Sequence, residues 1–217
     1  MTSETASVDE DSPPAEFNRP GQGQSYLIGD TIYLRGAELG DAKCATAWRP
    51  RPFPISAEEA KKQLKKSVPD ESEKRVALLI ACRRDDGLPV GSARVDESNP
   101  TMTPISLHVD PTLGAAGAQV QAEMLAQLVA WLSGERYRPV VVLATDAGLE
   151  PVQVAAESLG MRLAVRLRDG IWRNGQHHDM IFYEYLNPVW IARLGDPGPG
   201  IAVAGEPVGA PKAPAPR

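Results

Sequence analysis

The sequence lacks the features that identify several common classes of protein. It has two cysteines, Cys44 and Cys82, and neither shows the paired spacing of a zinc or disulfide site. No apolar run approaches the about 20 residues that cross a bilayer, and the acidic start, 1–16, has no apolar segment typical of a signal peptide. We therefore expect reduced thiols, no bound metal, no membrane partner and a cytoplasmic location.

The chain also has no excess of basic charge and few aromatic residues. The net charge is -5 at pH 7, so the chain has no overall positive field that would attract nucleic acid. The one dense basic run, 61–66, falls on an expected helix and is interpreted as a solvated face. Aromatic residues make up 6% of the chain, against 42% for all hydrophobic residues. The composition predicts a globular protein with an aliphatic core and no nucleic-acid partner.

The two ends of the chain carry little that could be buried. Residues 1–24 are rich in Ser, Glu, Pro and Gly, and residues 195–217 form a Pro/Gly/Ala tail. Burial of so few apolar groups cannot offset the entropy lost on ordering, so we expect both segments to be disordered. The region between them, 25–194, is long enough for one domain with a substantial core.

Hydrophobic periodicity divides this region into strands and helices. Its first part predicts a hairpin, two helices and three strands, in the order 25–35, 38–48, 56–68, 75–82, 89–95 and 105–109. Its second part predicts a helix, a buried strand, a helix and a closing hairpin, in the order 118–132, 139–145, 151–160, and 161–168 with 180–186.

Three short segments resemble one known family. The segment 31–36 with the helix after it is similar to the first strand and helix of the GNAT acyltransferases, in particular their RimJ/RimL-like branch. The corner Leu159-Gly160-Met161-Arg162 resembles that branch's Leu-Gly-Phe-Arg corner, and 179–185 with Trp190 looks like its last strand and trailing Trp. Together with the order of elements, the resemblance covers nearly all of 25–192.

The resemblance implies both a fold and an activity. The fold would be an α/β (α+β) GNAT fold, with a central mixed, mostly antiparallel sheet flanked by helices. The activity would be direct acyl transfer from acetyl-CoA or another acyl-CoA to an amine of a small molecule or a peptide N-terminus, without a metal. A homodimer is compatible with this interpretation. The alternative is a catalytically silent GNAT-fold protein that binds a ligand or a partner chain.

The same resemblance places the acyl-CoA site at the turn after the strand 105–109. Such a turn aims backbone amides at the pyrophosphate, and the dipole of the following helix adds positive potential. Two positions depart from the family pattern, since Leu113 replaces Arg or Gln and Ala116 replaces a Gly. The candidate cofactor-binding residues are Val109, Gly114, Ala115, Ala116, Gly117, Ala118 and Gln119.

The groups that move protons in this family are missing from their usual positions. A Glu common in the branch would match Pro104, and the Tyr that protonates the thiolate would fall near Ala155 or Ala156. His108 is the candidate substitute base, because imidazole titrates near neutral pH, and Tyr183 is the second candidate catalytic residue. The structural alternatives are a hydrogen-bonded strand histidine and a packed tyrosine.

The candidate substrate-binding residues are aromatic and lie near the expected helices and the last hairpin: Trp48, Phe53 and Trp172. Trp48, at helical spacing, could equally be a core residue. His177 and His178 are adjacent in a strand and should point to opposite faces, which argues against a metal site.

Overall fold

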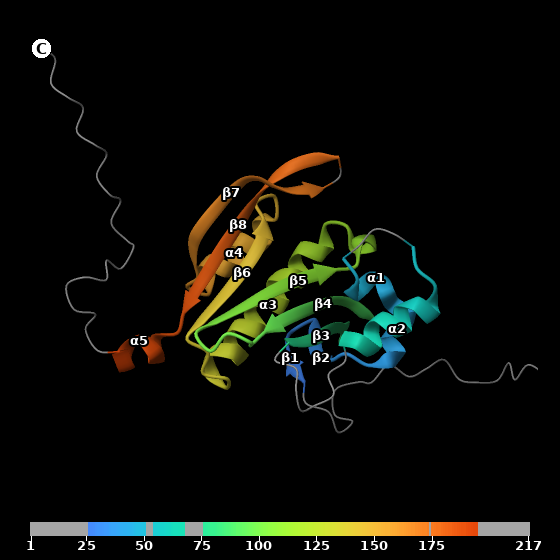
Figure 1. Ribbon diagram of the computed structural model, residues 1–217, viewed down its shortest axis with the longest axis horizontal. Helices are drawn as coiled ribbons and strands as arrows, with labels where there is room; N and C mark the ends of the chain where they lie inside the picture. Colours follow the sequence, from blue (N-terminus) through green and yellow to red (C-terminus); the bar gives the residue numbers. More distant parts are fainter. Residues whose placement is uncertain (1–25, 51–53, 68–75, 174, 195–217) are drawn as a thin grey trace, which may run out of the picture.

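The computed structural model describes residues 26–50, 54–67, 76–173 and 175–194. These residues form one sheet with the strand order β1-β2-β3-β4-β5-β6-β8-β7 (Figure 1). The strands are β1 (Leu27–Ile28), β2 (Ile32–Gly36), β3 (Val76–Arg83), β4 (Pro89–Asp96), β5 (Met102–Val109), β6 (Val140–Asp146), β7 (Arg162–Arg173) and β8 (Gln176–Leu186). The helical segments are η1 (Leu39–Cys44), α1 (Ala45–Trp48), α2 (Ala57–Ser67), η2 (Pro111–Leu113), α3 (Ala116–Gly134), α4 (Glu150–Ser158) and α5 (Pro188–Leu194).

Helices cover both faces of this sheet. On one face α3 and α4 pack against the sheet in an aliphatic core that includes Leu128, Val141 and Ala156. On the other face η1, α1 and α2 form a smaller core around Trp48 and Leu64. Neighbouring strands are antiparallel except for β5 and β6, which run parallel. The predicted mixed, mostly antiparallel sheet flanked by helices is therefore confirmed.

The longest helix forms where the sequence predicts it. Met124, Leu128 and Leu132 recur every four residues and are fully buried, as an amphipathic helix requires. Burying each of these side chains is worth roughly 1.5–3 kcal/mol. This burial holds α3 on the sheet and fixes where its first turn lies.

The segment 38–48 is not the single α-helix that the sequence predicts. The structure has the 3-10 helix η1, then a break at Cys44 (φ -115°, ψ 48°) and the short α1. Its apolar residues repeat every three positions, which matches the 3.0 residues per turn of a 3-10 helix better than the 3.6 of an α-helix.

The last hairpin is longer than predicted. The predicted first strand ends at Arg168, but β7 continues to Arg173. Asp169 has φ 53°, and the register shifts between Leu167 and Ile171. A local irregularity of this kind uses turn residues without ending a strand. Strand β5 also starts earlier than predicted, at Met102.

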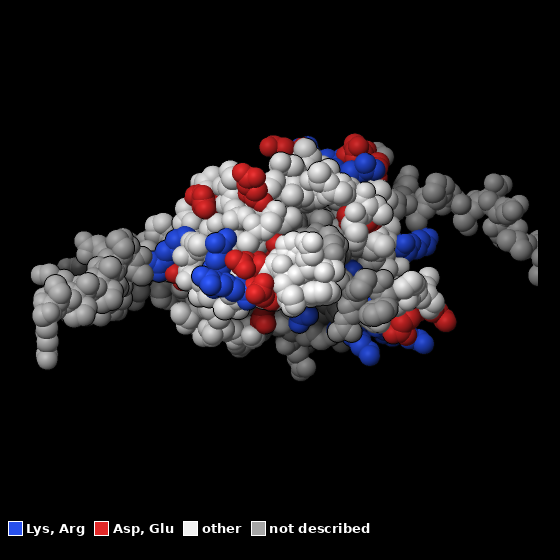
Figure 2. Space-filling view, turned by 90° about the horizontal axis from the view of Figure 1, so that it is seen from above, with Lys and Arg blue, Asp and Glu red and all other residues white. Residues whose placement is uncertain are grey.

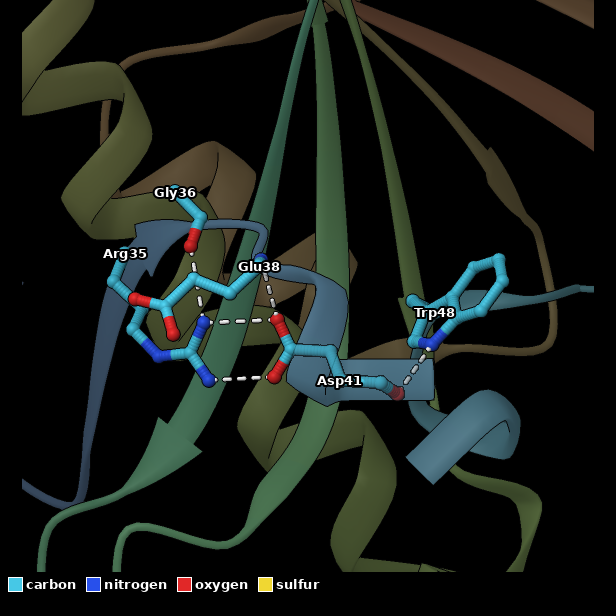
Figure 3. A network of polar contacts seen from close by, with 5 residues as sticks. All are labelled: Arg35, Gly36, Glu38, Asp41 and Trp48. Carbon is cyan, nitrogen blue, oxygen red and sulfur yellow. Dashed lines mark hydrogen bonds and ion pairs between the residues drawn. The ribbon is translucent and has the colours of Figure 1, made fainter. Parts of the chain in front are cut away.

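A buried ion pair ties η1 to β2 (Figure 3). Arg35 donates two hydrogen bonds to the Asp41 carboxylate, at 2.9 and 2.6 Å, and both side chains are 2% exposed. Asp41 also accepts from the Glu38 amide at 2.8 Å, and its own carbonyl accepts from the Trp48 indole at 2.9 Å. Removing one partner of such a pair typically costs about 3–5 kcal/mol. The network therefore fixes the segment that leads into α1.

The surface carries charges of both signs. Figure 2 shows lysines and arginines interleaved with aspartates and glutamates, rather than one continuous basic area on this face. Among the described helices, none has the length and hydrophobicity needed to cross a bilayer. Both cysteines have free thiols. The two end segments predicted to be disordered, 1–24 and 195–217, lie outside the described residues.

Candidate functional site

Strands β5 and β6 separate at their carboxyl ends. Their parallel pairing runs from Met102 opposite Val140 to Ile105 opposite Leu143. Both strands continue for several residues, to Val109 and Asp146, but within the described residues the pairing does not. Figure 1 shows the two strands diverging toward the end of the sheet where α1 lies. Beyond Ile105 and Leu143 the two strands are therefore not paired with each other, and we call the region between their carboxyl ends the gap.

Backbone groups of β5 face this gap. The Asp110 amide donates to the Val90 carbonyl on β4 at 2.8 Å, so at Asp110 the chain directs its polar groups toward β4. Neighbouring residues in a strand direct their N–H and C=O to opposite sides. Leu107 and Val109 therefore direct theirs toward β6, beyond the point where β6 pairs. An extended ligand in the gap could bond to them as an added strand would.

The turn between β5 and α3 is closed by local hydrogen bonds. The Asp110 carboxylate accepts from the Thr112 amide at 2.9 Å and from the Thr112 hydroxyl at 2.7 Å. Gly114 has φ 54°, a left-handed conformation that favours glycine, and its carbonyl accepts from the Gly117 amide at 3.1 Å. The turn is a defined structure that leads directly into the first turn of α3.

Two amides at the start of α3 have no protein acceptor among the described residues, those of Ala115 and Ala116. Both residues are exposed, and Ala115 caps the helix without a side-chain hydrogen bond. These amides and the helix dipole make the position suitable for an anion. The structure thus brings together the predicted cofactor-binding residues from Val109 to Gln119 around one helix start.

Gly117 has a packing role in the same turn. A Cβ at this position would lie 2.9 Å from Cγ2 of Val109, so only glycine lets α3 approach β5 this closely. Gly117 is buried, whereas Gly114, Ala115, Ala116 and Gln119 are exposed. The small residues of the turn therefore have two roles. Gly117 packs against β5, and the exposed residues leave their backbone groups accessible.

His108 lies on the face of the sheet that carries α1. Its Nε2 is 2.9 Å from the carbonyl oxygen of Thr46 on α1. A carbonyl only accepts, so Nε2 carries the proton and the lone pair of neutral His108 is on Nδ1. The Thr46 hydroxyl donates to the Asp110 carboxylate. Thr46 therefore joins α1 to the last residues of β5 by two contacts.

These contacts also affect the charge of Asp110. Burial would raise the pKa of its carboxyl group, but hydrogen bonds from Thr46 and Thr112, with nearby His108, outweigh burial and lower the pKa. Asp110 is therefore an anion at neutral pH, and it acts as the cap of η2.

Tyr183 lies in the core below α4. It is 2% exposed, and its hydroxyl donates to Oε1 of Glu157 at 3.0 Å. Burial and the Glu157 carboxylate raise the pKa of this phenol, which makes it a weaker acid. This environment resembles the packed tyrosine that the sequence left open as an alternative. Ala156, where the family's tyrosine would fall, is fully buried.

The three candidate substrate-binding aromatic residues have different surroundings. Trp48 is 7% exposed and packs in the smaller core, as the alternative interpretation of its spacing describes. Trp172 is 65% exposed on β7, and its ring contacts the His177 ring edge-to-face at 4.7 Å. Phe53 lies outside the described residues.

A polar pair that sequence reasoning missed lies on the other side of the gap. Nδ1 of His178 on β8 is 3.7 Å from Oδ1 of Asp146, the last residue of β6. Oδ1 also accepts from the Gly148 amide at 2.7 Å. The sequence signal for this pair was the carboxylate of Asp146 at the carboxyl end of a buried strand. His178 is 32 residues further along the chain, and no local sequence pattern links the two. Within the described residues, no three potential ligands converge as a metal site requires.

A cavity of about 310 Å³ lies beside the β1–β2 turn. None of its lining residues belongs to the candidate site; they are Asp30, Thr31, Ile32, Arg83, Arg84, Asp85 and Val120.

Solved structures with the same fold are acetyltransferases. A putative acetyltransferase from Sphaerobacter thermophilus is 30% identical, with TM-score 0.60, over 75% of this chain and 98% of that one. RimL, a ribosomal-protein α-N-acetyltransferase in complex with coenzyme A, is 13% identical, with TM-score 0.59, over 75% and 98%. The spermidine/spermine N-acetyltransferase SpeG from Vibrio cholerae is 14% identical, with TM-score 0.56, over 75% and 96%. No protein-family model and no curated protein matches the sequence.

Proposed function

Since this chain belongs to the GNAT family of acetyltransferases, we propose that it transfers the acyl group of acetyl-CoA, or of another acyl-CoA, directly to an amine. The gap between β5 and β6, which leads to the exposed amides of α3, carries this proposal. One end of the gap has backbone groups that can bond to an extended chain, and the other end has a helix start that can bind phosphate. An acyl-CoA has an extended pantetheine arm followed by a pyrophosphate, which matches this order.

The donor would bind mainly through the backbone. The amide-bearing pantetheine arm would extend along Leu107 and Val109, and the pyrophosphate would accept from the amides of Ala115 and Ala116. Contacts of this kind do not depend on side chains. They explain how the turn can hold an acyl-CoA although Leu113 and Ala116 depart from the family pattern.

His108 would accept the proton of the acceptor amine. Its hydrogen bond to Thr46 fixes the ring and leaves the lone pair on Nδ1. In the reaction the amine nitrogen bonds to the thioester carbon, the carbon–sulfur bond breaks, and the amine proton passes to Nδ1. Thr46 positions the imidazole on the face of the sheet opposite α3 and α4.

The acceptor would be a small-molecule amine or a peptide N-terminus. The related structures include enzymes for both kinds, a ribosomal-protein N-terminus and spermidine. Exposed Trp172, with Phe53, would contact the acceptor, while buried Trp48 would support the wall of the site. We also propose a cytoplasmic homodimer, with both cysteines reduced.

A catalytically silent binding protein is the second candidate. The residues that favour it are those that replace the family's chemical groups, Pro104 for the Glu and Ala156 for the Tyr. Such a protein would bind acetyl-CoA in the same gap without turnover.

A thiol-release assay with acetyl-CoA separates these candidates. We would measure free CoA with spermidine and with a short peptide bearing a free N-terminus as acceptors. Amine-dependent release is expected, and His108→Ala should lower kcat by about 10²-fold or more while leaving acetyl-CoA binding intact. Binding without release would favour the silent protein, and unchanged kcat in His108→Ala would remove His108 from the mechanism.

A further inference from the structure

The polar pair formed by Asp146 and His178 has no place in the function described so far. Asp146 is nearly buried, with 7% of its side chain exposed, while 33% of the His178 side chain is exposed. Burying a carboxylate lowers the stability of the folded protein unless a neighbouring group compensates for its lost hydration. The His178 imidazole lies beside this carboxylate. The pair also lies at the carboxyl end of β6, at the edge of the gap.

The pair faces the gap at the same level as His108. Ile105 and Leu143 are the last paired residues of β5 and β6, and both point into the core under α3 and α4. His108 and Asp146 each follow them by three residues, so alternation places both on the opposite face. His178 is two residues from Met180, the partner of Asp146, and shares that face. The two histidines therefore flank the gap from its two sides on one face.

The surroundings of His178 leave its imidazole beside one carboxylate. Among the described residues, β6 contributes Asp146, and β7 contributes the uncharged Ile171 as cross-strand partner. The β6–α4 turn contributes Gly148, where a Cβ would lie 3.2 Å from Oδ1 of Asp146 and 3.9 Å from Nδ1 of His178. Asp179, next in the chain, pairs instead with Arg166 at 3.4 Å. The Asp146 carboxylate is therefore the group placed to orient the imidazole of His178.

We propose that His178, positioned by Asp146, is the acid that protonates the leaving thiolate. In the family a tyrosine has this role, and in this chain Ala156 stands at the position of that tyrosine. This inference rests on the proposed acyl transfer. As the amine nitrogen bonds to the acyl carbon and its proton passes to His108, the carbon–sulfur bond breaks and sulfur takes a proton from Nε2 of His178. The products are the amide and CoA thiol. His108 is left protonated and His178 neutral, and exchange with water restores both.

The first test compares two adjacent histidines in the thiol-release assay with acetyl-CoA and spermidine or the peptide. His178→Gln should lower kcat by about 10²-fold with little change in KM for acetyl-CoA. His177→Gln is the matched control, because His177 is exposed, lies in the same strand and contacts Trp172 rather than Asp146. Equal kcat in His178→Gln and the unmodified protein would overturn the inference.

The second test asks whether Asp146 acts through His178. If Asp146 positions the His178 imidazole, Asp146→Asn should lower kcat in the unmodified protein but have little further effect in His178→Gln, where the group that it positions is gone. A purely structural role would lower kcat by the same factor in both backgrounds. Equal factors in both backgrounds would therefore also overturn the inference.

Acetyl-CoA binding, detected as a shift in thermal unfolding, distinguishes failure of the proposed acyl transfer from failure of this inference. If acetyl-CoA neither binds nor reacts, the proposed acyl transfer fails, and with it the inference. If acetyl-CoA binds and transfer proceeds, but His178→Gln and Asp146→Asn behave like the His177→Gln control, only the inference fails.

Discussion

At the scale of single residues, the Asp110 carboxylate connects separate parts of the candidate site. Its carboxylate accepts from Thr46 on α1 and from the backbone and side chain of Thr112 in the turn. Its pKa is lowered because these hydrogen bonds outweigh the effect of burial, which alone would raise it. A charged acceptor forms stronger hydrogen bonds than a neutral one, so the ionised form joins α1, β5 and the turn most firmly.

The lowered pKa of Asp110 predicts how stability depends on pH. A carboxyl group with a depressed pKa in the folded protein stabilises it above the unfolded pKa of about 3.9, and this contribution is lost as pH falls through the folded pKa. Asp110→Asn should therefore cost about 1 kcal/mol at pH 7, the difference between charged and neutral hydrogen bonds, and this cost should shrink as pH falls through the folded pKa. Urea unfolding at pH 7 and at several acidic pH values measures this.

Asp30→Asn is the control for this experiment, because Asp30 is exposed in the β1–β2 turn. It should change little at any of these pH values. A cost for Asp110→Asn that is the same at pH 7 and at low pH would show that the charge of Asp110 does not contribute to stability.

The residues of the site differ in how far the sequence could place them. Alternation along β5 is enough to put His108 on the face away from Ile105, because side chains in a strand alternate strictly. The contact of His108 with Thr46 depends on where α1 packs, and the hydroxyl partner of Tyr183, Glu157, depends on where α4 packs. Asp146 and His178 meet only because β6 and β8 are neighbours, and no local pattern carries that information.

At the scale of elements, the approach of α3 to β5 shapes the turn. Gly117 on α3 packs against Val109 so closely that a Cβ would lie 2.9 Å from Cγ2 of the valine. Because a branched side chain in a strand has little freedom to move aside, an added methyl group should push the helix start away from β5.

We predict that Gly117→Ala destabilises the protein by about 1–3 kcal/mol through overpacking and weakens acetyl-CoA binding. Gly40→Ala is the matched control, since a Cβ at Gly40 meets nothing within 4 Å. Shortening the opposing side chain in Val109→Ala/Gly117→Ala should restore most of the lost binding. Urea unfolding and acetyl-CoA titration measure both effects, and a Gly117→Ala protein that binds normally would contradict this role of the packing.

Elements with clear periodicity were predictable, and elements with local irregularities were less so. The four-residue repeat of α3 predicts its centre correctly. Helix α4 ends at Ser158, close to the predicted end at Gly160, which has φ 78°. The three-residue repeat at Leu39 to Trp48 was misinterpreted as an α-helix. The predicted first strand of the last hairpin ends too early, at Arg168, directly before the irregularity at Asp169 in β7.

At the scale of the whole molecule, the sheet provides two arms that separate around a gap. The arm formed by β4 and β5 carries His108 and leads into α3, and the arm formed by β6 and β8 carries Asp146 and His178. Helices α3 and α4 fill one face, so the proposed acceptor would have to approach from the face of η1, α1 and α2. This arrangement arises from strand order and from the one parallel pair, β5 and β6.

The central claim is that an acyl-CoA binds in this gap through backbone amides at the start of α3. The variant Ala115→Pro tests the amides directly, because it removes one N–H at a residue whose φ of -63° already suits proline. The preceding residue is Gly114, which tolerates a following proline more readily than a bulkier residue would. The variant should therefore remain folded and bind acetyl-CoA more weakly.

Thermal unfolding with increasing acetyl-CoA is the most direct measurement of this claim. At 100 times the dissociation constant the ligand should stabilise the folded protein by about 2.7 kcal/mol, which for a chain of this size is a rise in Tm of roughly 5–11 °C. The rise should saturate, and at the same concentrations it should be smaller in Ala115→Pro. No rise in Tm with acetyl-CoA or with any other acyl-CoA would contradict the account.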